Sequence, residues 1–227
     1  PALFKSTKIL SSAQFRITRN TKLAIDEEED DVLLAVRDFL ERRRHSEATR
    51  LEVSYRINRE IYTVLKEAFR LPLFKIYRIK GPMAFGNLMS LYSVDLPQFK
   101  YRALNATVPQ FFTLPHLFER LRKQDEFVYH PYDNFSTVVS FIRQAAEDPQ
   151  VKAIYQTIYR VSSVSPVIDA LMQAKRNGKN VTVVVELKAR FDEERNISWG
   201  EGLAALGVHV VYSPNDLKIH AKMCLVE

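Results

Sequence analysis

The second half of the chain alternates between short apolar runs and amphipathic segments. The runs have the length of strands, and the segments between them carry apolar side chains at helical spacing. Strands are predicted over Phe127–Tyr129, Val151–Tyr159, Val181–Leu187, Val208–Tyr212 and His220–Val226. Helices are predicted after Asn134, over Pro166–Arg176 before Gly178, and over Ile197–Leu206 before Gly207. This order predicts a βαβαβ pattern around a buried, mainly parallel sheet.

The first half is less regular but mixes the same two periods. Alternation predicts strands over Gln14–Arg19, Arg50–Tyr55 and Leu73–Ile79, and helical spacing predicts helices from Val32 to Leu40 and after Asn58. From Pro97 to Pro115 the chain loses any clear period, which marks a boundary. We therefore expect an α/β protein with an α+β first unit, and two domains, 1–106 and 107–227.

Composition agrees with a folded protein that prefers anionic partners. Of the 227 residues, 46% are hydrophobic and 26% are charged, and 33 Lys and Arg against 27 Asp and Glu give a net charge of +6 and a pI near 9.3. No apolar run approaches the roughly 20 residues of a membrane-spanning helix. We expect a cytoplasmic protein, with peripheral membrane association through its basic surface left open.

The single cysteine and the chain ends add two expectations. Cys224 stands among apolar residues of a predicted strand, so buried packing is its expected role. The chain starts at Pro1 without a methionine and stops at Glu227 inside an apolar run, which indicates a fragment of a longer protein.

Two arginines follow neighbouring predicted strands. Arg160 ends Val151–Tyr159, and Arg190 comes just after Val181–Leu187. Carboxyl ends of parallel strands meet at one edge of a sheet, where two guanidinium groups can clamp a phosphate. The alternative is that each arginine pairs with a nearby acid of the run Asp192-Glu193-Glu194.

His220-Ala221-Lys222 is the second candidate. Residues two apart on a strand project to one face, so the imidazole and the ammonium are expected to point into the same space. A neutral imidazole can attack phosphorus, and an adjacent cation stabilises phosphoryl oxygens. The alternative is a satisfied strand histidine beside an exposed lysine. His209 and His116 have no such partner and are interpreted as structural.

Other chemistries find less support. The acids Asp192, Glu193 and Glu194 would suit Mg²⁺, but three consecutive carboxylates do not converge on one ion without an irregular backbone. A solvated loop, or a loop that orients Arg190 and Arg195, is favoured instead. The sequence has no Gly-rich phosphate loop, no Cys/His zinc spacing and no Gly-x-Ser-x-Gly elbow.

Several motifs together resemble bacterial polyphosphate kinases. They are Ala153–Arg160, Ser165–Leu171, Asn177–Lys179, Val181–Ile197, Gly207–Tyr212 and Leu217–Lys222, in the family's order and approximate spacing. Upstream, His130–Phe135 resembles the start of the same domain, and Phe15–Val53 resembles the family's middle domain. The resemblance covers essentially the whole chain.

The resemblance implies part of a middle (head) domain followed by a truncated phospholipase-D-like domain. It implies reversible transfer of the terminal phosphate of ATP to inorganic polyphosphate, with His220 as phosphohistidine nucleophile and Lys222 stabilising phosphate. Arg160 and Arg190 match the family's magnesium positions; because guanidinium has no acceptor, we expect them to hold phosphate oxygens that in turn hold Mg²⁺.

The resemblance also bears on partners and completeness. ATP or ADP and polyphosphate are the implied substrates, no nucleic acid is required, and the full-length parent is expected to form a homo-oligomer. The family's N-terminal domain and a second histidine-bearing half are absent from this sequence, so we expect the 227 residues alone to have little or no synthetic activity. The alternatives are a phosphodiesterase of the phospholipase D superfamily and a non-catalytic module that binds polyanions.

Overall fold

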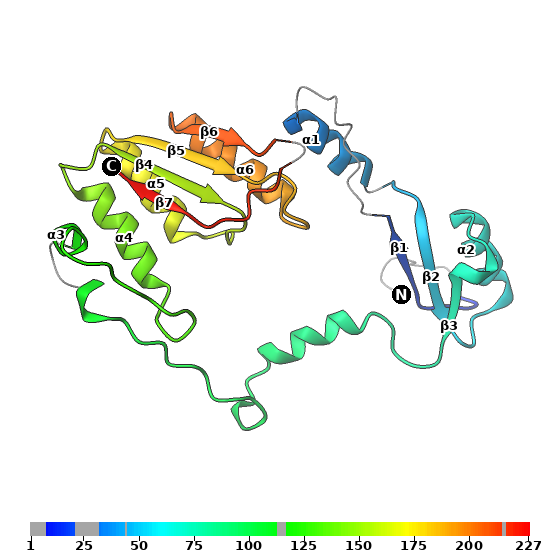
Figure 1. Cartoon of the computed structure of the whole chain (residues 1–227). Coiled ribbons are helices and arrows are strands. Elements are labelled where there is room, and N and C mark those ends of the chain that lie inside the picture. Colours follow the sequence, from blue (N-terminus) through cyan, green and yellow to red (C-terminus); the bar gives the residue numbers. More distant parts are fainter. Residues whose placement is uncertain (1–7, 21–31, 44, 113–116, 215–216) are drawn as a thin grey trace. The chain divides into compact units, whose positions relative to one another are not determined.

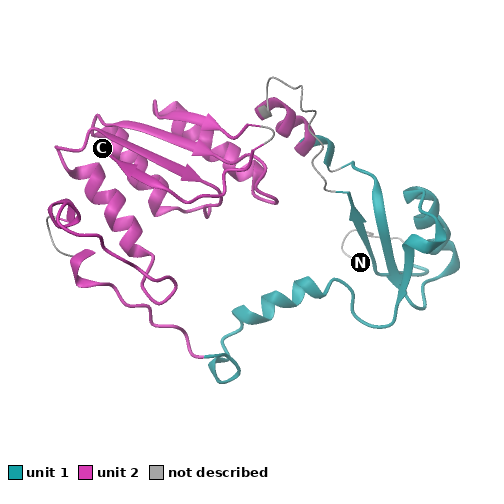
Figure 2. Cartoon of the chain, in the orientation of Figure 1, with its two compact units in different colours: residues 1–22, 41–101 teal, residues 23–40, 102–227 magenta. Residues whose placement is uncertain are grey.

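The structure is a computed structural model that describes residues 8–20, 32–43, 45–112, 117–214 and 217–227. The chain divides into two compact units, which Figure 2 colours separately: unit 1 is residues 1–22 and 41–101, and unit 2 is residues 23–40 and 102–227. The domain limits that we expected from the sequence, 1–106 and 107–227, stay a prediction.

Unit 2 is built on a four-stranded sheet with the order β6-β5-β4-β7 (Figure 1). Its strands are β4 (Ala153–Ile158), β5 (Asn180–Val185), β6 (His209–Tyr212) and β7 (Cys224–Val226). β4 pairs in parallel with β5, and β5 with β6, whereas β7 runs antiparallel to β4. The prediction of an α/β fold with a mainly parallel sheet is confirmed.

Helices cover the core side of this sheet. They are α3 (Leu117–Leu121), α4 (Ser136–Glu147), α5 (Pro166–Arg176) and α6 (Glu193–Ala205). Val181, Val183 and Val185 of β5 are buried against these helices, because alternate residues of a strand face the same side. Thr182 and Val184, on the other face, are only half-buried, so the sheet that we expected to be buried is less buried on this face of β5.

Residues at the helix limits explain where α4 and α5 begin and where α5 ends. The Ser165 hydroxyl accepts a hydrogen bond from the Ile168 amide at 3.4 Å, and Pro166 occupies the first turn, where its missing N–H costs nothing. Gly178 follows α5 with φ +82°, a left-handed conformation that a side chain would strain. The Asn134 side chain accepts from the Ser136 amide at 2.8 Å at the start of α4.

Three sequence predictions in unit 2 need correction. Phe127–Tyr129 is not a strand; the Tyr129 amide instead donates to the Asp133 carboxylate at 2.8 Å, closing a turn. α6 begins at Glu193 rather than Ile197, because polar residues of its first turn hid the helical period. β7 begins at Cys224, so His220–Met223 is not part of the strand.

Helix α1 (Val32–Arg43) starts early in the sequence but packs within unit 2 through most of its length. Val36 is fully buried in a small cluster with Leu187 and Ile197, and Arg37 forms an ion pair with Glu201. Burial raises the pKa of Tyr212, which packs against the same cluster, and the nearby Arg37 opposes part of that shift. No feature of the sequence indicated this long-range placement.

Unit 1 is a three-stranded sheet with the order β1-β2-β3 and one helix. Its elements are β1 (Phe15–Arg19), β2 (Ala48–Ser54), α2 (Arg59–Phe69) and β3 (Ile76–Ile79). Leu51 and Val53 of β2 are fully buried in its core. The Asn58 side chain caps α2 by accepting from the Glu60 amide at 2.7 Å, as predicted. Leu73–Lys75 forms a 3₁₀ turn, so β3 is shorter than expected.

The stretch that lost its period is irregular in the structure too. It contains the 3₁₀ helices η2 (Phe85–Ser93), η3 (Pro97–Phe99) and η4 (Gln110–Phe112), and none of their residues is buried. Within the described part of the chain, no helix is both long and apolar enough to cross a membrane.

Candidate functional site

The site forms at the carboxyl end of β4, around the ring of Tyr159. The His220 ring meets it edge-on, with ring centres 5.0 Å apart and planes at 90°. Tyr159 is half-buried, whereas His220 is exposed. The imidazole therefore faces solvent and does not enter the apolar interior.

Three cations approach the same Tyr159 ring. The Lys222 ammonium lies 4.5 Å from the ring centre, the Lys218 ammonium 5.4 Å, and the Arg160 guanidinium carbon 5.4 Å. A ring face attracts a cation placed over it, whereas the three like charges repel one another. One imidazole and three permanent or near-permanent positive charges thus gather around one aromatic platform, an arrangement suited to a phosphate group.

His220 and Lys222 do meet, but not for the reason the sequence suggested. The strand geometry assumed for His220-Ala221-Lys222 is wrong, since the strand starts two residues beyond Lys222. The Tyr159 ring brings the two side chains together instead, and the Lys222 ammonium also donates to the His220 carbonyl oxygen.

The segment that carries His220 is tied to β4 just before β7. The Thr157 hydroxyl donates to the Ala221 carbonyl at 2.8 Å and accepts from the Met223 amide at 2.9 Å. The Met223 carbonyl also accepts from the Thr157 amide and from the Gln156 side-chain amide, both at 3.0 Å. Two residues of β4 therefore hold the extended backbone of this segment just before the ladder with β7 begins.

Glu186 holds the other side of the same segment. Its side chain is fully buried at the end of β5. One carboxylate oxygen accepts from the Ile219 amide at 2.7 Å; the other accepts from the Lys188 amide at 2.8 Å and the Ser213 hydroxyl at 3.3 Å. Hydrogen bonds to an ionised acceptor are stronger than neutral ones, so Glu186 links the β5 end, the β6 end and the backbone next to His220.

Asn196 of α6 completes this support. Its buried side-chain amide donates to the Tyr159 carbonyl and to the Glu186 carbonyl, both at 2.8 Å. These two carbonyls belong to neighbouring strand ends, so one amide group sets the spacing between β4 and β5 where the site begins.

The two arginines meet in part. The Arg160 guanidinium donates to the Arg190 carbonyl at 2.8 Å and pairs with Asp192 at 2.8 Å, while Arg195 pairs with the other Asp192 oxygen at 2.7 Å. The alternative weighed for Arg160, pairing with a neighbouring acid, therefore holds. The Arg190 guanidinium is exposed and lies 5.6 Å from the Phe191 ring centre, and no ion pair is found for it within the described residues.

The acidic run is not a ready-made cation site. Asp192 is engaged by two arginines, and Glu193 is buried. Among the described residues, no group of three His, Cys, Asp or Glu side chains is arranged to hold a metal ion. The donor set fits phosphate oxygens, and Mg²⁺ fits here only as an ion already carried by those phosphates.

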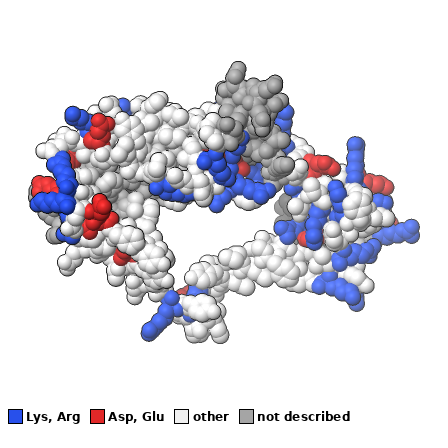
Figure 3. All heavy atoms as spheres, viewed as in Figure 1, with Lys and Arg blue, Asp and Glu red and all other residues white. Residues whose placement is uncertain are grey.

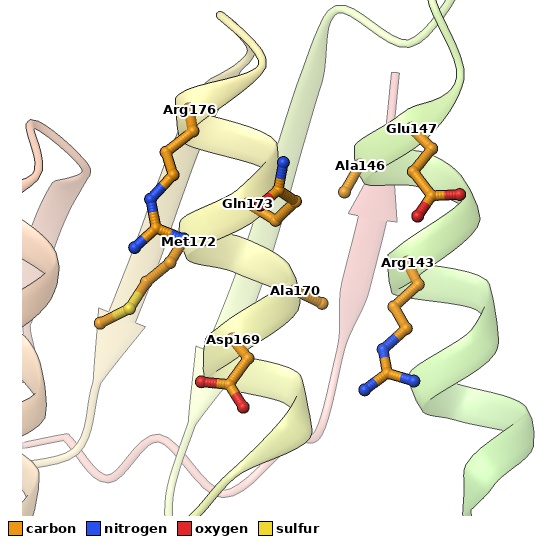
Figure 4. Close-up of a pocket in the computed structure, with 8 residues that line it drawn as sticks. All are labelled: Arg143, Ala146, Glu147, Asp169, Ala170, Met172, Gln173 and Arg176. Carbon is orange, nitrogen blue, oxygen red and sulfur yellow. The ribbon is translucent and has the colours of Figure 1, made fainter.

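A groove of unit 2 lies away from this site. This groove, of about 350 Å³, runs between α4 and α5, and Figure 4 shows Arg143 and Glu147 on one helix and Asp169 and Arg176 on the other. Two cations and two anions leave this groove without the excess positive charge that a polyphosphate or nucleotide needs.

The other residues considered from the sequence are His209, His116 and Cys224. His209 is exposed at the start of β6, and His116 lies outside the described residues. Cys224 is half-buried against the main core, and burial raises the pKa of its thiol to about 11. Neither Tyr159 nor Glu186 was predicted as a site residue from the sequence. Their only distinguishing feature there is their position at the end of an apolar run: Tyr159 is the last residue of Val151–Tyr159, and Glu186 is next to last in Val181–Leu187.

The fold is an α/β domain with a cation-rich site, preceded by a small α+β unit, and comparison with known proteins identifies its family. The family pattern described as "Polyphosphate kinase C-terminal domain 1" matches residues 116–227, and "Polyphosphate kinase middle domain" matches residues 1–91. The chain belongs to the polyphosphate kinase family, and the predicted order of middle domain and phospholipase-D-like C-terminal domain is confirmed.

Individual relatives agree. The chain is 42% identical over 226 residues to a polyphosphate kinase of Xylella fastidiosa, covering 99% of this chain and 32% of the relative, and 40% identical over 232 residues to one of Streptomyces coelicolor, covering 99% and 31%. The crystal structure of polyphosphate kinase from Porphyromonas gingivalis superposes with a TM-score of 0.69 at 26% identity, covering 99% of this chain and 31% of that one. The chain thus spans about a third of the length of its relatives.

Proposed function

We propose that this chain contributes the phosphoryl-transfer site of an ATP:polyphosphate phosphotransferase, with His220 as the nucleophile. The observation that carries the proposal is the exposed His220 imidazole held at the Tyr159 ring, where the Lys218, Lys222 and Arg160 cations also gather. The names of the relatives supply the substrate class, polyphosphate, and the cations supply the reason why a phosphate would stay.

The transfer runs in two balanced steps. An imidazole nitrogen attacks the terminal phosphorus of ATP; a P–N bond forms, the anhydride P–O bond breaks, and ADP leaves with the bridging oxygen. A terminal oxygen of polyphosphate then attacks the phosphohistidine, which breaks the P–N bond, lengthens the chain by one phosphate and restores His220. Nucleophilic catalysis of this kind divides one transfer into two easier displacements.

The surrounding residues have distinct roles in this proposal. Lys222, with Lys218 beside it, neutralises charge on the transferred phosphoryl oxygens, and Arg160 and Arg190 hold phosphates of the nucleotide or polymer. Mg²⁺ carried by those phosphates would neutralise further charge. Glu186 and Asn196 touch no reacting atom and act by holding the backbone around the site.

The sharpest test is a label on the protein. In the full-length protein that carries this segment, incubation with ATP labelled on the terminal phosphate should give an acid-labile, base-stable label. That label should vanish in His220→Ala and persist in His209→Ala, a matched control on another exposed histidine of unit 2. Retention of the label in His220→Ala removes the nucleophile assignment. Hydrolysis of a phosphodiester without any label would favour the phosphodiesterase alternative.

The predicted homo-oligomer, and the weak synthetic activity expected of these 227 residues alone, also stay proposals. Polymer growth by the 227-residue chain at the rate of the full-length protein would contradict the second.

A further inference from the structure

The positive charge of this protein is concentrated in the unit that does not contain the candidate site. Unit 1 has 17 lysines and arginines against 6 aspartates and glutamates, a net charge of +11; unit 2 has 16 against 21, a net charge of −5. The six acids of residues 26–31 and Asp216 in unit 2, and Lys5, Lys22 and Arg44 in unit 1, lie outside the described residues. Figure 3 shows Lys and Arg spheres over both units, which Figure 2 identifies by colour, so the difference in net charge comes mainly from the smaller number of acids in unit 1. The overall +6 therefore understates the attraction of unit 1 for a polyanion.

Part of this charge is organised along β3 and its neighbour. Three cations each lie over a tyrosine ring: Arg50 over Tyr77 at 4.0 Å, Lys80 over Tyr55 at 4.6 Å and Arg78 over Tyr62 at 5.1 Å from the ring centre. We call these six residues the cation–tyrosine strip. β3 is at the edge of its sheet, and the three cations are exposed. Because neighbouring residues of a strand face opposite sides, the Arg50–Tyr77 pair lies on one face and the Arg78–Tyr62 pair on the other, so the strip wraps around the free edge at β3.

The strip is not a set of satisfied ion pairs. Among the described residues, Arg50 is the one cation of the strip with an ion pair, to Glu52 at 2.8 Å. Glu52 also lies 3.8 Å from Arg16. One carboxylate thus faces two guanidinium groups. Stacking on a ring restrains a guanidinium without covering its N–H edge. Part of that edge is used here, since Arg50 donates to Glu52 at 2.9 Å and Arg78 donates to the Tyr55 carbonyl at 3.3 Å. The other N–H groups and the Lys80 ammonium supply the donors for an oxyanion.

The ligand chemistry follows from the rings. Single-stranded nucleic acid binds by stacking bases on exposed aromatic faces between cations. Here each tyrosine has a face already occupied by a cation, which leaves phosphate contacts as the main attraction. That favours a phosphate polymer without bases.

We propose that the cation–tyrosine strip of unit 1 binds inorganic polyphosphate, as a holding surface distinct from the transfer site at His220. The choice of polyphosphate rests on the proposed function; the existence of the surface rests on the charge and geometry of unit 1. The strip would raise the local concentration of polymer, in the way that clustered like charges attract and steer a polyanion.

The test measures binding of polyphosphate to the 227-residue chain without ATP, at several salt concentrations. The triple variant Arg50→Gln, Arg78→Gln, Lys80→Gln should weaken binding by roughly tenfold or more and lower the slope of log Kd against log salt by about 2, as expected for three lost phosphate contacts. The control triple Lys8→Gln, Lys66→Gln, Lys100→Gln removes the same charge from unit 1 outside the strip and should weaken binding much less. Circular dichroism and amide exchange confirm that each variant is folded.

Two further arms sharpen the result. Glu52→Gln removes the one carboxylate between Arg16 and Arg50 and should tighten polyphosphate binding by roughly twofold to fivefold, since a competing anion is lost. Poly(U) of the same total charge should bind more weakly than polyphosphate.

The binding measurements distinguish a specific polyphosphate surface from diffuse attraction and from a nucleic-acid surface. Equal losses in the two triple variants would mean diffuse attraction and would overturn the strip. Tighter binding of poly(U), lost in the strip variant, would make it a nucleic-acid surface instead. His220→Ala should bind polyphosphate as the wild type does, so failure of the nucleophile assignment and failure of this inference give different results.

Discussion

The two units of this chain handle charge in opposite ways. In unit 2 the carboxylate of Glu186 is fully buried, and its oxygens accept hydrogen bonds from two backbone amides and a hydroxyl next to the candidate site. In unit 1 a carboxylate, Glu52, lies on the sheet between two exposed arginines. Buried ionised groups with several donors define geometry, whereas surface pairs mainly adjust local potential. This contrast agrees with the proposed transfer site in unit 2 and the proposed holding surface in unit 1.

The cores differ in the same direction. The main cluster of unit 2 joins strands β4 and β5 to helices α4, α5 and α6, while unit 1 relies on a smaller cluster around Leu51 and Val53. A site that needs fixed distances between an imidazole and several cations benefits from the larger core, because densely packed interiors resist displacement.

The largest expected effect comes from breaking each core separately. Ile154→Ala in β4 and Leu51→Ala in β2 each remove a fully buried side chain, and each should cost about 2–5 kcal/mol in the free energy of unfolding. Amide exchange should show the loss of protection mainly in the unit that carries the substitution, since the two clusters share no residue. Equal loss of protection in both units after either change would contradict this division.

The two carboxylates offer a matched pair of smaller changes. Glu186→Gln keeps the shape but replaces an ionised acceptor, and should cost about 1–3 kcal/mol and speed amide exchange at Ile219. Glu52→Gln should change stability by less than about 1 kcal/mol, as for other surface ion pairs. In the full-length protein, Glu186→Gln should slow labelling of His220 by roughly tenfold without abolishing it. An unchanged exchange rate at Ile219 would remove Glu186 as a positioning residue.

The smallest expected effect is a pH dependence. Burial raises the pKa of Cys224 to about 11, so the folded state keeps the thiol proton that the unfolded state loses at its ordinary, lower pKa. This contribution to stability is present at neutral pH and decreases as the pH rises through the unfolded pKa toward the folded one. Between pH 8 and 10, Cys224→Ala should show a flatter fall in stability than the wild type by urea unfolding. Identical slopes would mean that the thiol is not protected in the folded state.

The sequence by itself determined most of unit 2's framework. Apolar runs predicted β4, β5 and β6, and Ser165, Pro166 and Gly178 predicted the limits of α5, because strand alternation, caps and left-handed stops are local properties of a few neighbouring residues. The motif resemblance likewise identified the family, and Arg160, Arg190, His220 and Lys222 as its candidates.

Only the tertiary structure decided how those candidates are held. His220 and Lys222 both contact the Tyr159 ring, and Arg160 forms an ion pair with Asp192. The Glu186 carboxylate accepts a hydrogen bond from the amide of Ile219, 33 residues later in the chain. α1 packs onto Leu187 and Ile197, which come much later in the chain. Such contacts depend on which surfaces chain folding brings together, and no periodicity over a few residues carries that information. Local sequence determined where the helices and strands form. Long-range packing determined how the cations, the imidazole and the buried carboxylate are arranged at the ends of β4 and β5.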